Sequence, residues 1–258
     1  ATPGAAPFIL MYWRSSHYGG AVVALAAGER WTKVIGPFFL YVNSGSNPQS
    51  LWKDALNRSA RETEKWPYEW VAGVDYPRKS ERGSVRGQLL LDDPQMPGAK
   101  TPNLLVGLTP PAYTPPVTRP GGFGPPRQID WQTDAKHYEF WVRGDEQGNF
   151  TIPNVRAGNY VLRAFTDGVL GEFARADVAL HPGQSLDLGK LSWTPLRRGK
   201  QLWEIGIPNR NGSEFFHGEN YADPAISLKY ATLFPNDVNY AIGKSDFRTD
   251  WFFQHVPH

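Results

Sequence analysis

The sequence predicts an all-β protein with one short helix, and three observations support this fold class. Turn-forming residues are plentiful, with 26 Gly and 23 Pro among 258 residues. Aromatic residues, which favour strands, make up 14% of the chain. Apolar and polar residues alternate along residues 138–173, whereas a helical spacing is confined to residues 47–66. We therefore expect strands joined by turns and long loops over most of the chain.

Residues 138–173 contain the clearest strand pattern. Every second residue is apolar in three successive runs, which places one side of each predicted strand against a core. Turn signals at residues 145–148 and 156–159 separate the runs. We expect Gly148 and Gly158 to have positive φ, a conformation that glycine adopts at low cost. The residues predicted to face the core are Phe140, Val142, Phe150, Ile152, Tyr160, Leu162 and Ala164.

Residues 8–42 also have the composition of strands. Apolar runs cover residues 8–13, 21–26 and 31–42. A polar turn, RSSHYGG at residues 14–20, separates the first two runs. Two adjacent strands would present this turn at the end of a sheet, where loops commonly carry functional residues.

One helix is expected after these strands. Ser46 or Asn47 is placed to cap its first turn, and Pro48 suits the first helical positions. The helix should end before Pro67, because the residue before a proline disfavours the α conformation. Its predicted apolar face consists of Leu51, Trp52, Ala55 and Leu56.

A charged stretch at residues 77–83 indicates a domain boundary, and we expect three regions, residues 1–78, 79–196 and 197–258. The middle region should add strands to those above, whereas residues 109–126, rich in Pro and Gly, should form an exposed loop. The last region, with roughly three predicted strands, is marginal as an independent domain. We therefore expect the remainder of its own polypeptide, or complementing chains, to complete the fold. The added strands are expected at residues 85–91, 104–108, 176–180 and 186–193.

Composition argues against several classes of partner and site. The formal charge is only +2 and no basic stripe is present, so we expect no nucleic acid. No apolar run approaches the roughly 18 residues of a membrane span. Cys is absent, which removes disulfides, thiolate catalysis and cysteine metal sites. We expect a secreted or periplasmic protein whose leader has been removed or lies outside this sequence.

Three stretches, in this order, resemble rhamnogalacturonan lyases of polysaccharide lyase family 4. YWRSSHYGG, GERWTKVIGPFFLYVN and KWPYEW resemble the end of the family's large catalytic β-sandwich. GSVRGQLLL, the 138–173 stretch and LDLGKLSWTP resemble its middle domain, a fibronectin-III-like or transthyretin-like β-sandwich. QLWEIGIPNR and IGKSDFRTDW resemble the start of its carbohydrate-binding-like jelly roll. The resemblance covers nearly the whole chain.

The resemblance implies that the partner is a pectic polysaccharide, rhamnogalacturonan I, and that the reaction is β-elimination at a 4-linked galacturonate without a cofactor. A cation near the C6 carboxylate must stabilise the developing charge, and a base must reach the C5 proton. His17 in RSSHYGG matches the family's catalytic histidine. The family's lysine is expected upstream of this sequence, so Lys33 is not its counterpart. Arg14 and Tyr18 are candidates to bind the uronate, or else form a structural salt bridge and a packed ring.

Aromatic residues in the last region are further candidates for sugar contacts. Trp203 and Trp251 offer flat faces on which sugar rings can stack, with core packing as the alternative. No metal site is expected. The acidic residues of this region are too loosely spaced for a calcium loop, and His137 and His217 lack ligand spacing and are expected to be solvated.

Two other classes of function stay open. The chain is alternatively a non-catalytic carbohydrate-binding module in which the middle β-sandwich serves as a spacer. A cell-surface adhesion or scaffold protein is the third alternative, and it leaves RSSHYGG and IGKSDFRTDW unexplained. An upstream β-sandwich with a lysine facing His17 would distinguish the enzyme from both.

Overall fold

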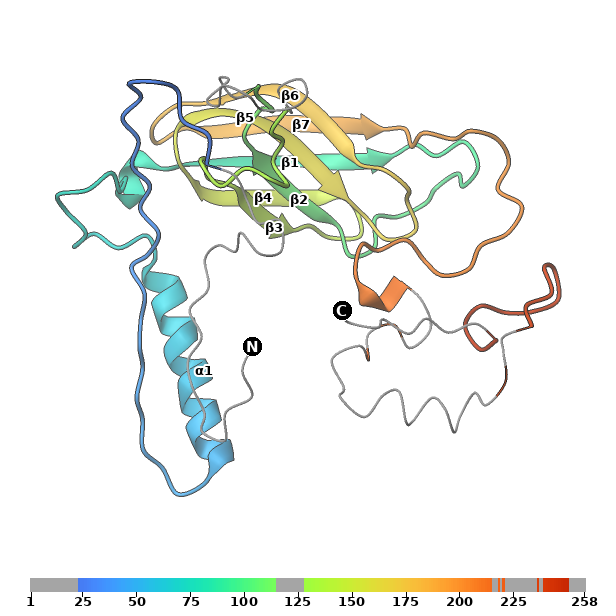
Figure 1. The fold of residues 1–258 in the computed structure, drawn as a ribbon, viewed down its shortest axis with the longest axis horizontal. Coiled ribbons are helices and arrows are strands. Elements are labelled where there is room, and N and C mark those ends of the chain that lie inside the picture. Colours follow the sequence, from blue (N-terminus) through green and yellow to red (C-terminus); the bar gives the residue numbers. More distant parts are fainter. Residues whose placement is uncertain are drawn as a thin grey trace.

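The computed structural model describes residues 23–114, 128–214, 218, 220, 236 and 239–250. Its centre is a sandwich of two β-sheets between residues 83 and 193, with one long helix to the side (Figure 1). The all-β class predicted from the sequence is therefore confirmed, and the strands predicted within residues 85–193 are all present.

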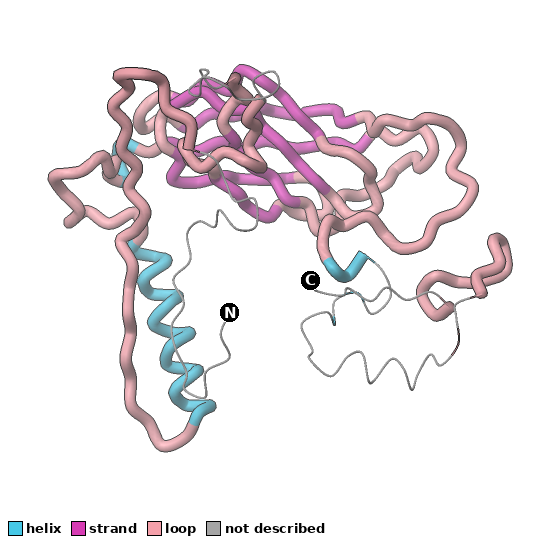
Figure 2. The backbone as a smooth tube through the Cα atoms, viewed as in Figure 1, coloured by secondary structure: helices cyan, strands magenta, loops and turns pink. Residues whose placement is uncertain are grey.

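The first sheet has three strands in the order β4-β1-β7. The central strand β1 pairs antiparallel with β4 and parallel with β7. Parallel neighbours need a crossover connection, and here the connection passes through the strands of the other sheet. Figure 2 shows the strands gathered in one body and the helix apart from them. The strands of this sheet are β1 (Gly83–Leu91), β4 (Asn149–Val155) and β7 (Ser185–Trp193).

The second sheet has four strands in the order β3-β2-β5-β6, and all its neighbours are antiparallel. Strand β2 pairs on one side with β3 and on the other with β5. Thr109, predicted to begin an exposed loop, is instead the buried last residue of β2. Residues 115–126 of that predicted loop lie outside the described residues. The strands are β2 (Leu105–Thr109), β3 (Phe140–Arg143), β5 (Gly158–Phe165) and β6 (Phe173–Leu180).

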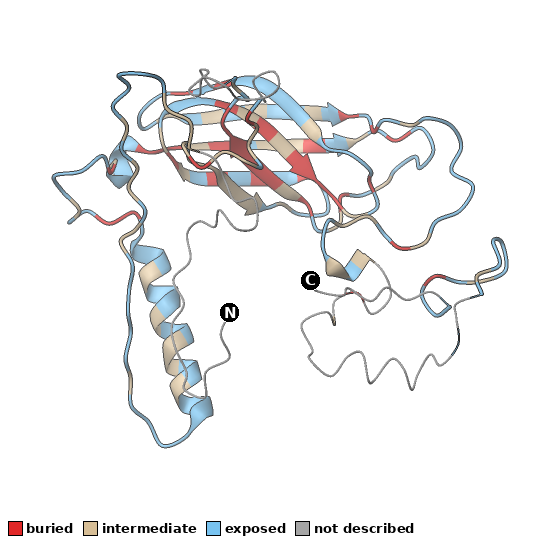
Figure 3. Ribbon diagram, viewed as in Figure 1, coloured by how far each residue is buried: buried red, intermediate tan, exposed pale blue. Residues whose placement is uncertain are grey.

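The hydrophobic core lies between the two sheets, as the distribution of buried residues in Figure 3 shows. Val85 and Leu89 of β1 and Leu162 of β5 are at most 1% exposed. The predicted alternation is confirmed, since the inward-facing residues of β4 and β5 are buried and Phe140 and Val142 of β3 pack against them. A period of two in the sequence thus places one face of each strand in the core.

The two turn glycines behave differently. Gly148 has φ +84°, as expected, and a Cβ there would lie 1.9 Å from the carbonyl oxygen of Leu89. The expectation for Gly158 was wrong, because it is not a positive-φ residue and pairs with Leu180 inside the sheet. Asn154 in β4 has φ +58° instead. Asn tolerates this conformation because its short polar side chain can bond locally.

Two regions predicted to contain strands do not form them in the described part of the chain. Residues 23–42 belong to no sheet, and the described residues of 201–250 contain no strand. A strand must exchange backbone hydrogen bonds with a neighbouring strand. Val34 instead bonds to the Tyr138 hydroxyl through both its backbone N–H and its C=O. Residues 8–13 lie outside the described residues.

Helix α1 spans Pro48–Lys65 and confirms the predicted helix. The Asn47 side chain caps it by accepting from the backbone N–H of Ser50 at 2.8 Å, and the helix ends before Pro67. Its predicted apolar face is only partly covered within the described residues, because Leu51 and Ala55 are half-buried whereas Trp52 is 68% and Leu56 is 52% exposed. No helix in the described part of the chain has the length and apolarity to cross a membrane.

Candidate functional site

Of the five residues predicted to form the site, the structure describes one. Arg14, His17, Tyr18 and Trp251 lie outside the described residues, so the roles assigned to them stay predictions. Trp203 lies in the segment that follows the sandwich. We therefore build the candidate site from Trp203 outward.

Trp203 lines an open pocket of about 610 Å³ beside the connection between β5 and β6. The residue is 50% exposed, so the described residues do not bury it in a core. Leu170, Leu196 and Ile205 form apolar walls around it. A half-exposed indole next to apolar walls offers the flat surface on which a sugar ring can stack.

The same pocket carries positive charge. Arg198 and Lys200 line it, are exposed, and form no ion pair within the described residues. Glu204 and Glu214 also line the pocket, so it holds both signs of charge. The arrangement can stack a ring on Trp203 while a nearby cation pairs with a carboxylate of the same ligand.

Arg197 fixes this segment to the sandwich. Its guanidinium donates through Nε and Nη2 to the buried carboxylate of Asp93, just after β1. These hydrogen bonds lower the pKa of Asp93. The backbone N–H of Gln201 adds a bond to the Gln95 side chain at 3.2 Å. The sequence suggested only a basic linker at residues 197–200, because an ion pair between residues so far apart leaves no local pattern.

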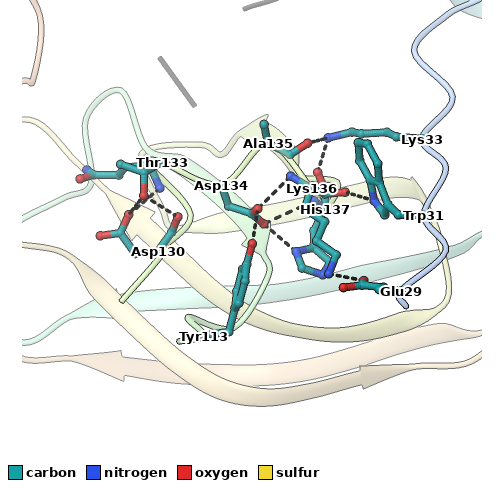
Figure 4. Close-up of polar contacts among 11 residues, drawn as sticks. Glu29, Trp31, Lys33, Tyr113, Asp130, Thr133, Asp134, Ala135, Lys136 and His137 are labelled. Atoms are coloured by element: carbon teal, nitrogen blue, oxygen red, sulfur yellow. Dashed lines mark hydrogen bonds and ion pairs between the residues drawn. The ribbon is translucent and has the colours of Figure 1, made fainter. Parts of the chain in front are cut away.

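A second polar cluster joins residues 29–34, which we call the strap, to the loop before β3 (Figure 4). Lys33 Nζ donates to the carbonyl oxygens of Ala135, at 2.8 Å, and His137. Burial lowers the pKa of Lys33. Trp31 Nε1 donates to the carbonyl oxygen of Lys136 at 3.3 Å. Because Lys33 contacts two backbone carbonyls, it holds the loop in place. Lys136 also pairs with Glu29.

Asp134 organises the loop that the strap contacts. Its buried carboxylate accepts from the Tyr113 hydroxyl at 3.2 Å and from the Lys136 N–H at 2.8 Å. His137 Nδ1 lies 2.6 Å from the same carboxylate, and the His137 ring meets Tyr113 edge-on. His137 was predicted to be a solvated loop residue, and it is an exposed loop residue whose ring is also held by these contacts. No metal-binding group of three or more His, Asp or Glu occurs in the described part of the chain.

Comparison with known proteins identifies two regions of the chain. Residues 110–188 match the family model described as polysaccharide lyase family 4, domain II. Residues 201–258 match the model described as polysaccharide lyase family 4, domain III. Together the two matches cover more than half of the chain. The crystal structure of a 9R-lipoxygenase from Cyanothece PCC8801 aligns with a TM-score of 0.25 and 16% identity, over 70% of this chain and 29% of that one.

Similar proteins agree with the domain matches. A rhamnogalacturonate lyase of Dickeya dadantii is 30% identical over 248 residues, which are 95% of this chain and 36% of that protein. A probable rhamnogalacturonate lyase B of Aspergillus terreus is 28% identical over 261 residues, which are 93% of this chain and 35% of that protein. The chain thus spans about a third of the length of these relatives. It belongs to polysaccharide lyase family 4.

Proposed function

We propose that this chain is part of a rhamnogalacturonan lyase, which cleaves the rhamnose–galacturonate backbone of pectin by β-elimination. The observation that carries the proposal is the similarity to rhamnogalacturonate lyases, which runs through 95% of the chain. Residues 1–78 then belong to the catalytic β-sandwich, 79–196 to the middle domain and 197–258 to the carbohydrate-binding-like domain. A secreted or periplasmic location suits a protein that acts on a plant cell-wall polymer.

The chemical step needs a base for the weakly acidic C5 proton and a proton for the departing O4. His17 carries one of these transfers, since the reference pKa of histidine, about 6.5, lets it gain or lose a proton near neutral pH. A lysine upstream of this sequence stabilises the charge that develops near the C6 carboxylate. Arg14 and Tyr18, in the same turn as His17, bind the carboxylate and the leaving oxygen.

The Trp203 pocket binds the same polymer away from the bond that is cleaved. Its indole face stacks on a sugar ring, and Arg198 or Lys200 pairs with a galacturonate carboxylate. The half-exposed ring and the two unpaired cations of the described segment support this assignment. The pocket keeps the enzyme on its polymer, because a second contact raises the local concentration of substrate.

The test is ultraviolet absorbance of the unsaturated uronate that forms when the full-length protein is incubated with rhamnogalacturonan I. We expect a steady rise with the parent and at least a 100-fold slower rise with His17→Ala, because proton transfer contributes about 10²–10⁴-fold. The matched control is His181→Ala, which changes an exposed histidine in the turn before β7 and should keep the parent rate.

Two outcomes would contradict the proposal. A folded His17→Ala variant with the parent rate would remove His17 from the chemistry. No rise with a folded parent would exclude the lyase, and binding of the polymer that is lost in Trp203→Ala would then favour a non-catalytic carbohydrate-binding module.

A further inference from the structure

A second pocket, of about 400 Å³, lies beside the Trp203 pocket, and Pro208 lines both. It is formed where the end of the four-stranded sheet meets residues 208–213. Two backbone bonds hold the walls together, from Gly168 N–H to the Pro208 carbonyl at 3.0 Å and from Asp167 N–H to the Pro102 carbonyl at 3.1 Å. Its volume falls in the range of about 300–1,000 Å³ that is typical of sites for small ligands.

Two arginines give this pocket a positive charge. Arg143, at the end of β3, is exposed and forms no ion pair within the described residues. The guanidinium of Arg210 lies 3.9 Å from the centre of the Phe165 ring and donates to the carbonyl oxygen of Gly171 at 3.1 Å. The acidic residue of the pocket wall is Asp167, whose carboxylate accepts from the Asn103 side chain at 2.7 Å. The pocket wall thus carries two positive charges and one carboxylate that is already hydrogen-bonded to Asn103, and this excess of positive charge favours an anionic ligand.

The other wall presents polar groups that are already oriented. Asn209 Nδ2 donates to the Ser213 hydroxyl at 2.7 Å, and its Oδ1 accepts from the Asn211 N–H at 3.0 Å. The Ser213 hydroxyl in turn bonds the Asn211 side chain. Amide and hydroxyl groups of this kind exchange hydrogen bonds with the hydroxyls of a sugar. Because they are held by one another, little ordering is needed when a ligand binds.

Two residues of the pocket wall have a backbone conformation that side chains rarely adopt. Asn103 has φ +51° and Arg210 has φ +61°, and they are two of the four non-glycine residues with positive φ in the described part of the chain. Such conformations persist where surrounding contacts enforce them, and they concentrate at binding sites. For Arg210 those contacts are the Phe165 ring and the Gly171 carbonyl.

We propose that this pocket binds a uronic acid unit of a saccharide. The guanidinium of Arg143 pairs with the sugar carboxylate, and the Asn209–Ser213 wall bonds the ring hydroxyls. Arg143 is suited to this contact because its planar guanidinium can make two parallel hydrogen bonds to a carboxylate. The choice of galacturonate as the uronic acid rests on the proposed function, whereas the preference for a carboxylate rests on the pocket. The two neighbouring pockets then hold successive parts of one acidic polysaccharide.

The experiment uses the full-length protein carrying His17→Ala, so that the saccharide is not cleaved. A rhamnogalacturonan I tetrasaccharide is added, and affinity is measured by calorimetry while amide hydrogen exchange locates the contact. We expect protection of residues 166–169 and 207–213. Adding Arg143→Gln should reduce that protection and weaken binding by about tenfold or more, the loss expected when charge-assisted hydrogen bonds to a carboxylate are removed. Adding Arg175→Gln, the same charge change on an exposed position of β6, should change neither.

Two further saccharides test whether binding at this pocket needs a carboxylate. Galacturonate alone should bind weakly at the same amides, and a neutral galactotetraose should not protect them. Equal protection by galactotetraose, or unchanged protection in Arg143→Gln, would overturn the proposal. The absorbance assay on the protein with His17 intact reads the proposed function separately. Lyase activity without protection of this pocket would refute the subsite alone, whereas protection without lyase activity would refute the enzyme and keep the subsite.

Discussion

The middle sandwich and the segments that flank it differ in how far they bury apolar side chains. Within residues 83–193, Leu104 and Leu162 have no exposed surface. In the flanks, Leu40 is 70%, Val42 is 81% and Leu202 is 82% exposed. The sandwich therefore buries a core of its own, whereas the described flanks present apolar surface that the described residues do not cover. Such surfaces commonly mark places where other parts of a protein or a partner make contact.

The largest expected difference in stability comes from replacing one leucine in each of the two regions. Leu162→Ala should lower the free energy of unfolding by about 2–5 kcal/mol, because it leaves a cavity between the sheets. Leu202→Ala should change it by less than about 0.5 kcal/mol, because the side chain is already in solvent. Urea unfolding followed by far-ultraviolet circular dichroism measures both. Similar losses in the two variants would show that the flank shares the core of the sandwich.

An effect of intermediate size is the loss of stability of the sandwich at alkaline pH. Tyr160 is 7% exposed, donates to the Arg156 carbonyl at 2.8 Å, and has its pKa raised by burial to about 12. In the unfolded chain the phenol ionises near pH 10. The contribution of the neutral, buried phenol to the free energy of unfolding is therefore complete below pH 10 and is lost as the pH rises toward 12. We expect a loss of roughly 1–2 kcal/mol across this interval.

The alkaline loss can be assigned by removing the phenols one at a time. Tyr160→Phe should reduce the fall in unfolding free energy between pH 10 and 12. Tyr113→Phe should remove a further part, since burial also raises the pKa of Tyr113 to about 12. Urea unfolding at each pH measures the change. An identical alkaline loss in parent and Tyr160→Phe would mean that this hydroxyl does not contribute.

The same contrast explains what the sequence could predict. Alternation along β4 and β5 and the capping of α1 by Asn47 depend on neighbouring residues, so they could be read locally. Positive φ at Asn154 rather than at Gly158 depends on how two strands meet, and sequence reasoning misplaced it. The unpaired residues 31–42 had strand composition, but a strand also needs a partner strand.

The site shows the same division between local and distant information. Trp203 could be chosen from its residue type, because an aromatic side chain is a candidate wherever sugars bind. Arg143 could not, since an arginine at the end of a strand is ordinary until the fold brings Asn209 and Arg210 beside it. The contacts of Arg197 with Asp93 and of Lys33 with Ala135 each join residues about a hundred positions apart.

The smallest expected effect lies where a flank meets the sandwich, at the strap of residues 29–34. Lys33→Met removes both hydrogen bonds from Nζ to the loop before β3, whereas the Val34 N–H still donates to Tyr138. Amide exchange at Val34 should become about fivefold faster, which corresponds to a loss of about 1 kcal/mol for two partly exposed bonds. The sandwich amides should keep the parent rates. Lys53→Met, on the exposed surface of α1, should leave Val34 unchanged. If the slowly exchanging amides of β2 and β5 also lost protection in Lys33→Met, the strap would unfold together with the sandwich. The boundary between sandwich and flank would then lie before residue 29.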